Sequence, residues 1–276
     1  MKFSLASIIG AAFGFALIIG AVMMGTKNYL AFCSLEGLMI VVGGPLAVAF
    51  MSFQANNVLE ALRGIGLMFR QPQATHENLH KELVKIIDWA RTIKTGGLRS
   101  LEAKAVPSDL SDPFIRYGIA MVVSNYKPEE VRMMMDTAAE GYYERDTIPA
   151  RVLMAMAGHA PAFGMVGTLV GMIIMLGAFK DDMSGVGSGL SISLLATLYG
   201  VVTARMIYMP AASRITQKQE SLRFRNHLIT EGLVMLVANE TPRHIQDRLN
   251  SFLRPESHHD IDAERLEAAS QRKGAA

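Results

Sequence analysis

An apolar run from Gly158 to Leu176 carries side chains whose types and spacing could serve an ion path. Four of its residues recur at steps of three and four, which puts them on one face of a helix: Pro161, Gly164, Thr168 and Gly171. A proline inside a helix removes a backbone hydrogen bond, and in a membrane the freed carbonyl needs another partner. This face could therefore be a hinge beside a hydrated ion path, or a surface of small residues for close helix packing. The spacing leaves both interpretations open.

A second apolar run, from Ser188 to Met209, shows a similar face of small or hydroxyl residues: Ser193, Thr197, Gly200 and Ala204. Neither run holds an acid or a base at mid-depth. Because a proton or sodium relay usually needs an ionisable group inside the membrane, we expect this chain to supply half of a pathway. The missing carboxylate would come from another subunit.

Composition limits the class of protein. The 276 residues are 50% apolar and 19% charged, a mixture that favours a membrane protein with a large polar part. The single cysteine, Cys33, excludes an internal disulfide, and a net charge of +2 gives no reason to expect nucleic acid as a partner. No nucleophile has a paired base, so we expect neither an enzyme nor a cofactor. We also expect no metal site, because the histidine pairs 76/80 and 258/259 should be solvated.

The apolar runs predict an all-α membrane protein with four transmembrane helices and a helical cytoplasmic domain. The predicted spans are residues 4–24, 30–53, 151–179 and 188–209. They form two hairpins, within residues 1–53 and 150–210, and the fourth span should stop at Pro210. A signal peptide competes for the first span, but a second apolar run follows almost at once.

The intervening segments are polar. Residues 54–149 should form a cytoplasmic helical domain and residues 211–276 a cytoplasmic helical tail. Helix starts are predicted near Pro113, Pro128 and Pro242, because each proline stands where a first helical turn begins.

Charge predicts the orientation. Lysines and arginines crowd the two polar segments, whereas the short connectors hold only Lys27 and Lys180. By the positive-inside tendency, the polar segments and both termini should face the cytoplasm. Glu36 and Arg205 lie near the ends of their spans, where each could reach an interface.

Several motifs match one family. They are APAFGMVGTLVG at 160–171, LLATLYG at 194–200, IVVGG at 40–44, and Gly96-Gly97 followed by Leu101-Glu102. Together with the four-span pattern, which covers nearly the whole chain, they resemble the MotA/PomA flagellar stator proteins. The ExbB/TolQ energisers of envelope machines are also similar, but they have three spans and lack the tight N-terminal hairpin.

The resemblance implies a stator subunit of the bacterial inner membrane, surrounded by lipid. With a MotB/PomB-type partner that supplies a membrane aspartate, it would form an ion channel and convert ion-motive force into torque. It also implies a homopentamer around a dimer of that partner, acting on the rotor switch protein FliG.

Individual positions carry over from the family. Pro161 matches a proline that couples ion passage to conformational change, and Pro210 matches the proline at the cytoplasmic end of the fourth span. Thr168 and Thr197 match hydroxyls that face the partner's aspartate in sodium-type members, and Gly164 lies on the same pathway face. These matches predict an ion pathway between the third and fourth spans.

Lys94 and Glu102 match the charged residues that engage the rotor. The transported ion stays open between sodium and proton. Sodium-type members usually have two adjacent threonines in the fourth span, whereas this chain has Ala196 before Thr197. The two hydroxyls favour sodium slightly. A passive scaffold and a solute transporter are alternatives from other classes, but a transporter would usually show an inverted repeat.

Overall fold

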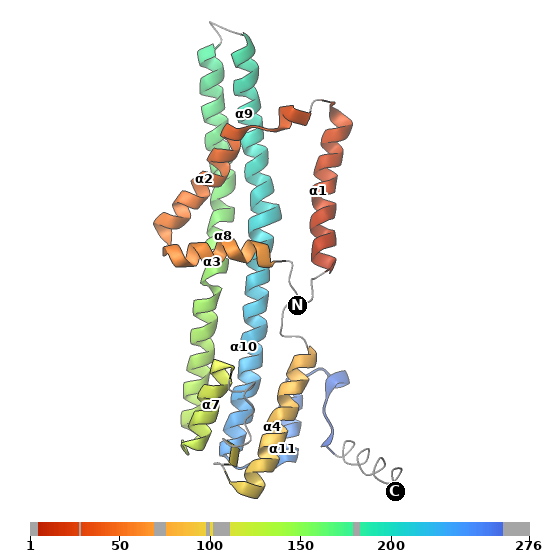
Figure 1. Cartoon of the computed structure of the whole chain (residues 1–276), viewed down its shortest axis with the longest axis vertical. Coiled ribbons are helices and arrows are strands. Elements are labelled where there is room, and N and C mark those ends of the chain that lie inside the picture. The colour runs from red at the N-terminus through yellow and green to blue at the C-terminus, as the bar shows by residue number, and fades with distance from the viewer. Residues whose placement is uncertain are drawn as a thin grey trace. The chain divides into compact units, whose positions relative to one another are not determined.

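The computed structural model is mostly helical in the part that it describes, and no strand occurs there (Figure 1). The described residues are 5–27, 29–68, 76–97, 100–101, 111–178 and 183–261. Contacts divide the chain into two units. The membrane unit comprises residues 1–71 and 146–217, and the polar unit comprises residues 72–145 and 218–276.

The membrane unit contains the helices of the apolar runs. Its elements are α1 (Leu5–Gly25), η1 (Tyr29–Phe32), α2 (Leu35–Ser52), α3 (Ala55–Leu67), α9 (Met183–Val202), the π-helical η2 (Thr203–Tyr208), and parts of α8 (Pro128–Ala178) and α10 (Met209–Val237).

Helices of the polar unit are shorter. They are α4 (His76–Gly96), α7 (Pro113–Val123), α11 (Pro242–Asn250) and η3 (Pro255–Ser257), together with the remaining parts of α8 and α10.

Local cap residues explain where several helices begin. Ser34 caps α2 by accepting a hydrogen bond from the Gly37 amide at 3.1 Å. Asp112 caps α7 in the same way, and Thr241 caps α11. The predicted starts at Pro113, Pro128 and Pro242 are confirmed.

Four of the described helical stretches are long and apolar enough to cross a membrane, which confirms the predicted fold class. The expected stop at Pro210 does not end the helix, however, because helical structure continues through this proline, which is the second residue of α10. Pro149 likewise lies inside α8. A proline does not end a helix when its neighbours accommodate the lost hydrogen bond, so proline position alone does not fix a helix end.

The two units have different cores. In the membrane unit the buried cluster is rich in small side chains, among them Ala157, Ala160, Ala204 and Ala211. The first span has none of its residues buried. In the polar unit the cluster consists mostly of large side chains, including Leu83, Ile86, Met135 and Leu233.

Ion pairs stabilise the edges of the polar core. Arg225 contacts Glu82 (Nη2–Oε1) and Asp112 (Nη1–Oδ2), each at 2.7 Å. Glu231 accepts hydrogen bonds from Arg132 at 2.7 Å and from Arg248 at 2.8 Å. These pairs join α4, α7, α8, α10 and α11 within the unit.

The histidine expectation needs a correction. His80 is half-buried, and its ring packs edge-on against the ring of His259, with centroids 5.5 Å apart. Asn250 holds the His259 backbone through two hydrogen bonds of 2.9 Å, which brings the segment after η3 against α4 and α11.

Candidate functional site

α8 and α9 lie side by side in the membrane unit, and glycines set how close they come (Figure 1). A β-carbon added to Gly164 would lie 3.0 Å from the Ala196 carbonyl oxygen. At Gly171 it would lie 2.6 Å from the Gly189 oxygen, and at Gly200 it would lie 2.7 Å from the Ala160 oxygen. Since these neighbours are backbone atoms, only glycine fits without moving a helix, as in small-residue packing of membrane helices.

The close approach brings two hydroxyls from different helices together. Thr168 Oγ1 lies 2.6 Å from Thr197 Oγ1. The carbonyl oxygens of Gly164 and Ser193 each lie 3.1 Å from Thr168 Oγ1. The result is a cluster of four oxygens drawn from α8 and α9, which we call the hydroxyl cluster.

Ser193 fixes the geometry of this cluster. The residue is 2% exposed, and its hydroxyl lies 2.9 Å from the carbonyl oxygens of both Thr168 and Gly189. A hydroxyl has one proton to donate, so these are alternative acceptors. Either bond ties Ser193 to the backbone beside the cluster and holds α9 in register with α8.

The hydroxyl cluster opens to the surface of the unit. Thr197 is exposed and Thr168 is half-buried. Large apolar residues next to them in sequence, Leu169 and Leu194, are 58% and 64% exposed. Within the described part of the chain, the hydrogen-bond partners of the two threonines are hydroxyl and carbonyl oxygens, and none of them is a carboxylate.

Glu36 lies in the first turn of α2 and is held there by local contacts. Its Oε2 accepts a hydrogen bond from the Ser34 hydroxyl at 3.1 Å. The Tyr199 hydroxyl of α9 accepts from the Ser34 amide at 3.1 Å and donates to the Phe32 carbonyl. A carboxylate at a helix N-terminus interacts favourably with the helix dipole, so this position suits a structural role.

Pro161 lies within α8, beside α9. A β-carbon on Gly200 would lie 3.3 Å from the Pro161 Cα, which places the proline at a close helix contact rather than on an outer face. Ala196 is fully buried, with its backbone against Gly164. A threonine at position 196 would need room that this packing does not provide.

The structure also contains a feature that sequence reasoning missed. The π-helical η2 interrupts the α-helical pattern, and the Met209 amide bonds to the Ala204 oxygen five residues earlier. Thr203 Oγ1 bonds back to the Tyr199 oxygen at 2.7 Å, and Pro210 has no amide proton to donate. A hydroxyl that bonds back, followed within seven residues by a proline, was the available signal. π-Helical turns occur frequently at functional sites.

The remaining predicted site residues lie elsewhere. Lys94 is exposed in the last turn of α4, and Glu102 falls outside the described residues. Arg205 is exposed on η2, and its Nη1 lies 3.2 Å from the Met209 sulfur. Within the membrane unit the structure therefore brings together Pro161, Gly164, Thr168 and Thr197.

Comparison with known proteins identifies the family. Residues 107–228 match the MotA/TolQ/ExbB proton channel family. The chain is 30% identical over 253 residues to YtxD of Bacillus subtilis, covering 91% of each protein. It is 29% identical over 249 residues to the chemotaxis protein PomA of Vibrio alginolyticus, covering 90% of this chain and 95% of PomA.

A solved structure of MotAB from C. jejuni has the same fold. It superimposes with a TM-score of 0.79 at 22% identity, covering 94% of this chain and 98% of that one. The fold and the sequence relatives agree with the motifs around the hydroxyl cluster. The chain therefore belongs to the MotA/TolQ/ExbB proton channel family, as a member of its MotA/PomA group of stator subunits.

Proposed function

We propose that this chain is a stator subunit of a bacterial flagellar motor. With a MotB/PomB-type partner it forms an ion channel that converts ion-motive force into torque on the rotor. The names of the relatives, PomA and motility protein A, support this role. The proposed role consists of ion conduction and torque generation, and it includes no catalysed reaction.

The hydroxyl cluster is the observation that carries the proposal. Two threonine hydroxyls 2.6 Å apart, with two carbonyl oxygens beside them, can hold a cation or a water. They cannot themselves release or bind a proton at physiological pH, because a hydroxyl is not an ionisable group there. The exposed position of Thr197 leaves room for a carboxylate from a partner helix, which supplies the missing charge.

The assembly and orientation form part of the same proposal. We place the chain in the inner membrane with both termini and the polar unit in the cytoplasm, as the distribution of lysine and arginine indicates. Five copies surround a partner dimer, and Lys94 and Glu102 engage the rotor protein FliG. One elementary charge crossing 100 mV provides about 2.3 kcal/mol, enough for a modest rearrangement at Pro161.

Swimming of a cell that lacks its own stator tests this role. The cell receives this chain with its cognate partner, and its speed is measured in sodium-free buffer, with added sodium, and with a protonophore. Swimming that follows sodium assigns the hydroxyls as ion ligands. Swimming that ignores sodium and falls with the protonophore makes the motor proton-driven. No swimming with both subunits present in the membrane contradicts the stator role and favours an ExbB/TolQ-like function.

Single-hydroxyl variants sharpen the test. If sodium is the ion, Thr168→Ala and Thr197→Ala should each raise the sodium needed for half-maximal speed by about tenfold, the value of one bond to a charged group. Thr203→Ala is the matched control, because its hydroxyl bonds back to Tyr199 within its own helical run. Equal effects of all three variants would contradict a specific role for the cluster.

The rotor contact needs its own test. Lys94→Glu reverses an exposed charge and should slow swimming without changing ion leak through the channel. A compensating charge reversal on FliG should restore speed. Failure of every such reversal would remove Lys94 from the contact.

A further inference from the structure

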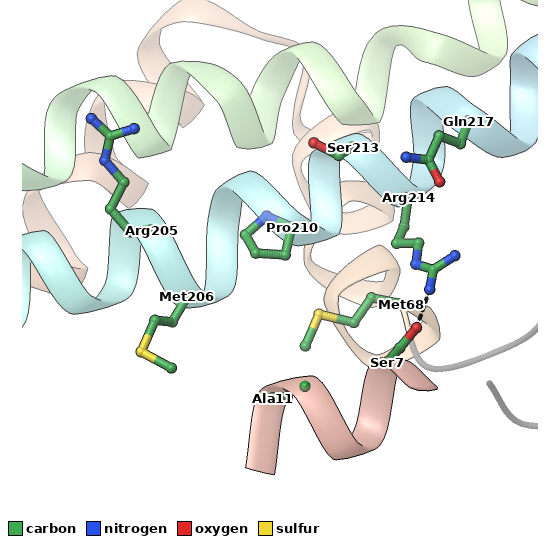
Figure 2. Close-up of a pocket in the computed structure, with 10 residues that line it drawn as sticks. Ser7, Ala11, Met68, Arg205, Met206, Pro210, Ser213, Arg214 and Gln217 are labelled. Carbon is green, nitrogen blue, oxygen red and sulfur yellow. Dashed lines mark hydrogen bonds between the residues drawn. The ribbon is translucent and has the colours of Figure 1, made fainter. Parts of the chain in front are cut away.

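A cleft in the membrane unit lies between α1, η2 and the start of α10, away from the hydroxyl cluster. Its volume is about 540 Å³, and Met68, just after α3, also contributes to its wall. Figure 2 shows Arg214 pointing toward Ser7 of α1, to which it is hydrogen-bonded. Arg205 lies on the other side of Pro210 along the helical run.

The lining combines positive charge with apolar walls. Arg214, Gln217 and the hydroxyl of Ser7 provide hydrogen-bonding groups around one part of the cleft, whereas Met206, Met68 and Ala11 provide apolar surface. Arg205 adds a second guanidinium. Its side-chain hydrogen bond is to the thioether sulfur of Met209, and among the described residues no ion pair with a carboxylate neutralises its charge.

The position of the cleft matches the boundary of a membrane. Ser7 begins the apolar stretch of the first span, and Pro210 follows the last apolar residues of the fourth. Outward from the cleft along α1, Phe13 and Leu17 are 66% and 59% exposed, which is surface suited to acyl chains. A ligand here would meet Arg214 toward one end of the cleft and apolar surface along α1.

We propose that this cleft binds the headgroup of an anionic phospholipid, with its phosphate near Arg214 and its acyl chains along α1. Arginine guanidinium groups pair well with phosphate oxygens, and basic pockets between spans on the cytoplasmic side suit anionic headgroups. The bound lipid lies between α1 and the fourth span, beside the hydrogen bond of Ser7 with Arg214 and the approach of Met206 to Gly14. The proposal requires a membrane-spanning chain and does not depend on torque generation.

Native mass spectrometry of the full-length protein, released from nanodiscs, tests the proposal. The nanodiscs contain equal amounts of phosphatidylglycerol and phosphatidylcholine with identical acyl chains. The wild-type chain should retain phosphatidylglycerol in preference. Arg205→Gln and Arg214→Gln should each reduce that preference roughly fivefold, the effect of one arginine near an anionic surface, and Arg214→Lys should keep most of it.

Two control variants distinguish binding in the cleft from a general effect of surface charge. Arg63→Gln removes an exposed arginine of α3 that does not line the cleft and should leave the preference unchanged. Ser7→Ala removes the hydrogen bond to Arg214 but no charge, so it should keep more of the preference than Arg214→Gln. A loss with Arg63→Gln as large as with Arg205→Gln would indicate general surface charge and overturn the proposal.

Further outcomes would also overturn it. Equal retention of the two lipids by the wild-type chain would exclude a headgroup site. Inorganic phosphate alone, if it stabilised the protein as much as the lipid and did so through Arg214, would make this a site for a free anion. A change in oligomeric state with Arg205→Gln, without any change in lipid retention, would show that a second copy of the chain covers the cleft.

Discussion

The α8–α9 pair and the polar unit solve the problem of helix packing in opposite ways. In the pair, glycines at 164, 171, 189 and 200 let backbones touch, and threonine and serine hydroxyls bond across the contact. In the polar unit, large side chains fill the core and arginine–carboxylate pairs such as Arg225–Glu82 close its edges. The difference follows from the solvent. Lipid is as apolar as leucine, so burying leucine in a membrane gains little, whereas in water it is the main stabilising term.

The contrast predicts that a substitution can unfold the polar unit or disable the membrane unit without affecting the other unit. The chain has one tryptophan, Trp89, which is 4% exposed in the core of the polar unit. Its fluorescence therefore reports unfolding of that unit in the full-length protein. Swimming and ion leak report on the membrane unit.

The largest effect should come from filling the helix contact. Gly171→Ala places a β-carbon 2.6 Å from the Gly189 oxygen, so the helices must separate, and we expect complete loss of swimming. Gly177→Ala is the control on the same helix, since its β-carbon would meet no atom within 4 Å, and it should swim normally. The Trp89 transition should not move in either variant. A shift in that transition with Gly171→Ala would show that the units are not independent.

The next largest effect distinguishes the packing of the α8–α9 pair from its movement during ion passage. Pro161→Ala restores an amide donor in α8 and should abolish swimming while leaving the amount of assembled stator unchanged. Pro149→Ala, at the other proline inside α8, should retain most swimming. Swimming and pull-down with the partner subunit measure the two outcomes. Normal swimming of the Pro161 variant would contradict the hinge.

A smaller effect is expected in the polar unit. Glu231 is 8% exposed and bonds to two arginines. Glu231→Gln leaves one arginine unpaired and should lower the free energy of unfolding by about 2 kcal/mol, since the arginines are partly exposed. The midpoint of the Trp89 transition would fall by roughly 6 °C. Asp247→Asn, in an exposed pair 3.8 Å long with Arg243, should shift it by less than about 2 °C.

The smallest effect depends on pH. Burial acts to raise the pKa of Glu231, but the hydrogen bonds from Arg132 and Arg248 outweigh it, so the pKa lies below its ordinary value of 4.5. The ionised form therefore stabilises the folded state fully above pH 4.5, and this contribution is lost as the pH falls through the lowered pKa. The difference in midpoint between wild type and Glu231→Gln should stay constant from pH 7 to about 5 and narrow below about 4.5. A difference that does not change with pH would contradict this assignment.

Features with local causes could be predicted from the sequence. The spans follow from apolar runs, and the starts of α7, α8 and α11 follow from a capping residue or a proline in the first turn. Helical spacing also put Thr168 and Thr197 on small-residue faces, although it could not show that their oxygens meet. That contact requires the two helix backbones to approach as closely as glycine permits. The approach depends on both helices together, and the sequence of one helix does not reveal it.

Features with distant causes could not be predicted. The Tyr199 hydroxyl reaches a backbone segment 165 residues away, and no pattern near either end signals the contact. α8 continues past Pro149 and the helical run continues past Pro210, and the sequence around each proline does not signal this. A proline marks a place where a helix can stop, and the neighbours decide whether it does.

The π-helical segment η2 also decides which residues of the helical run through η2 and α10 face α1. Ser7 and Gly14 are seven residues apart and face Arg214 and Met206, which are eight apart. In an α-helix seven residues turn through about 700°, close to two full turns. Eight residues turn through about 80° more than two full turns, so the eighth would not face the same way. The wide turn absorbs the additional residue, so that both Met206 and Arg214 face α1. Deleting one residue within η2 should thus be tolerated better than a deletion within α9, because it would restore an ordinary helix with the same facing.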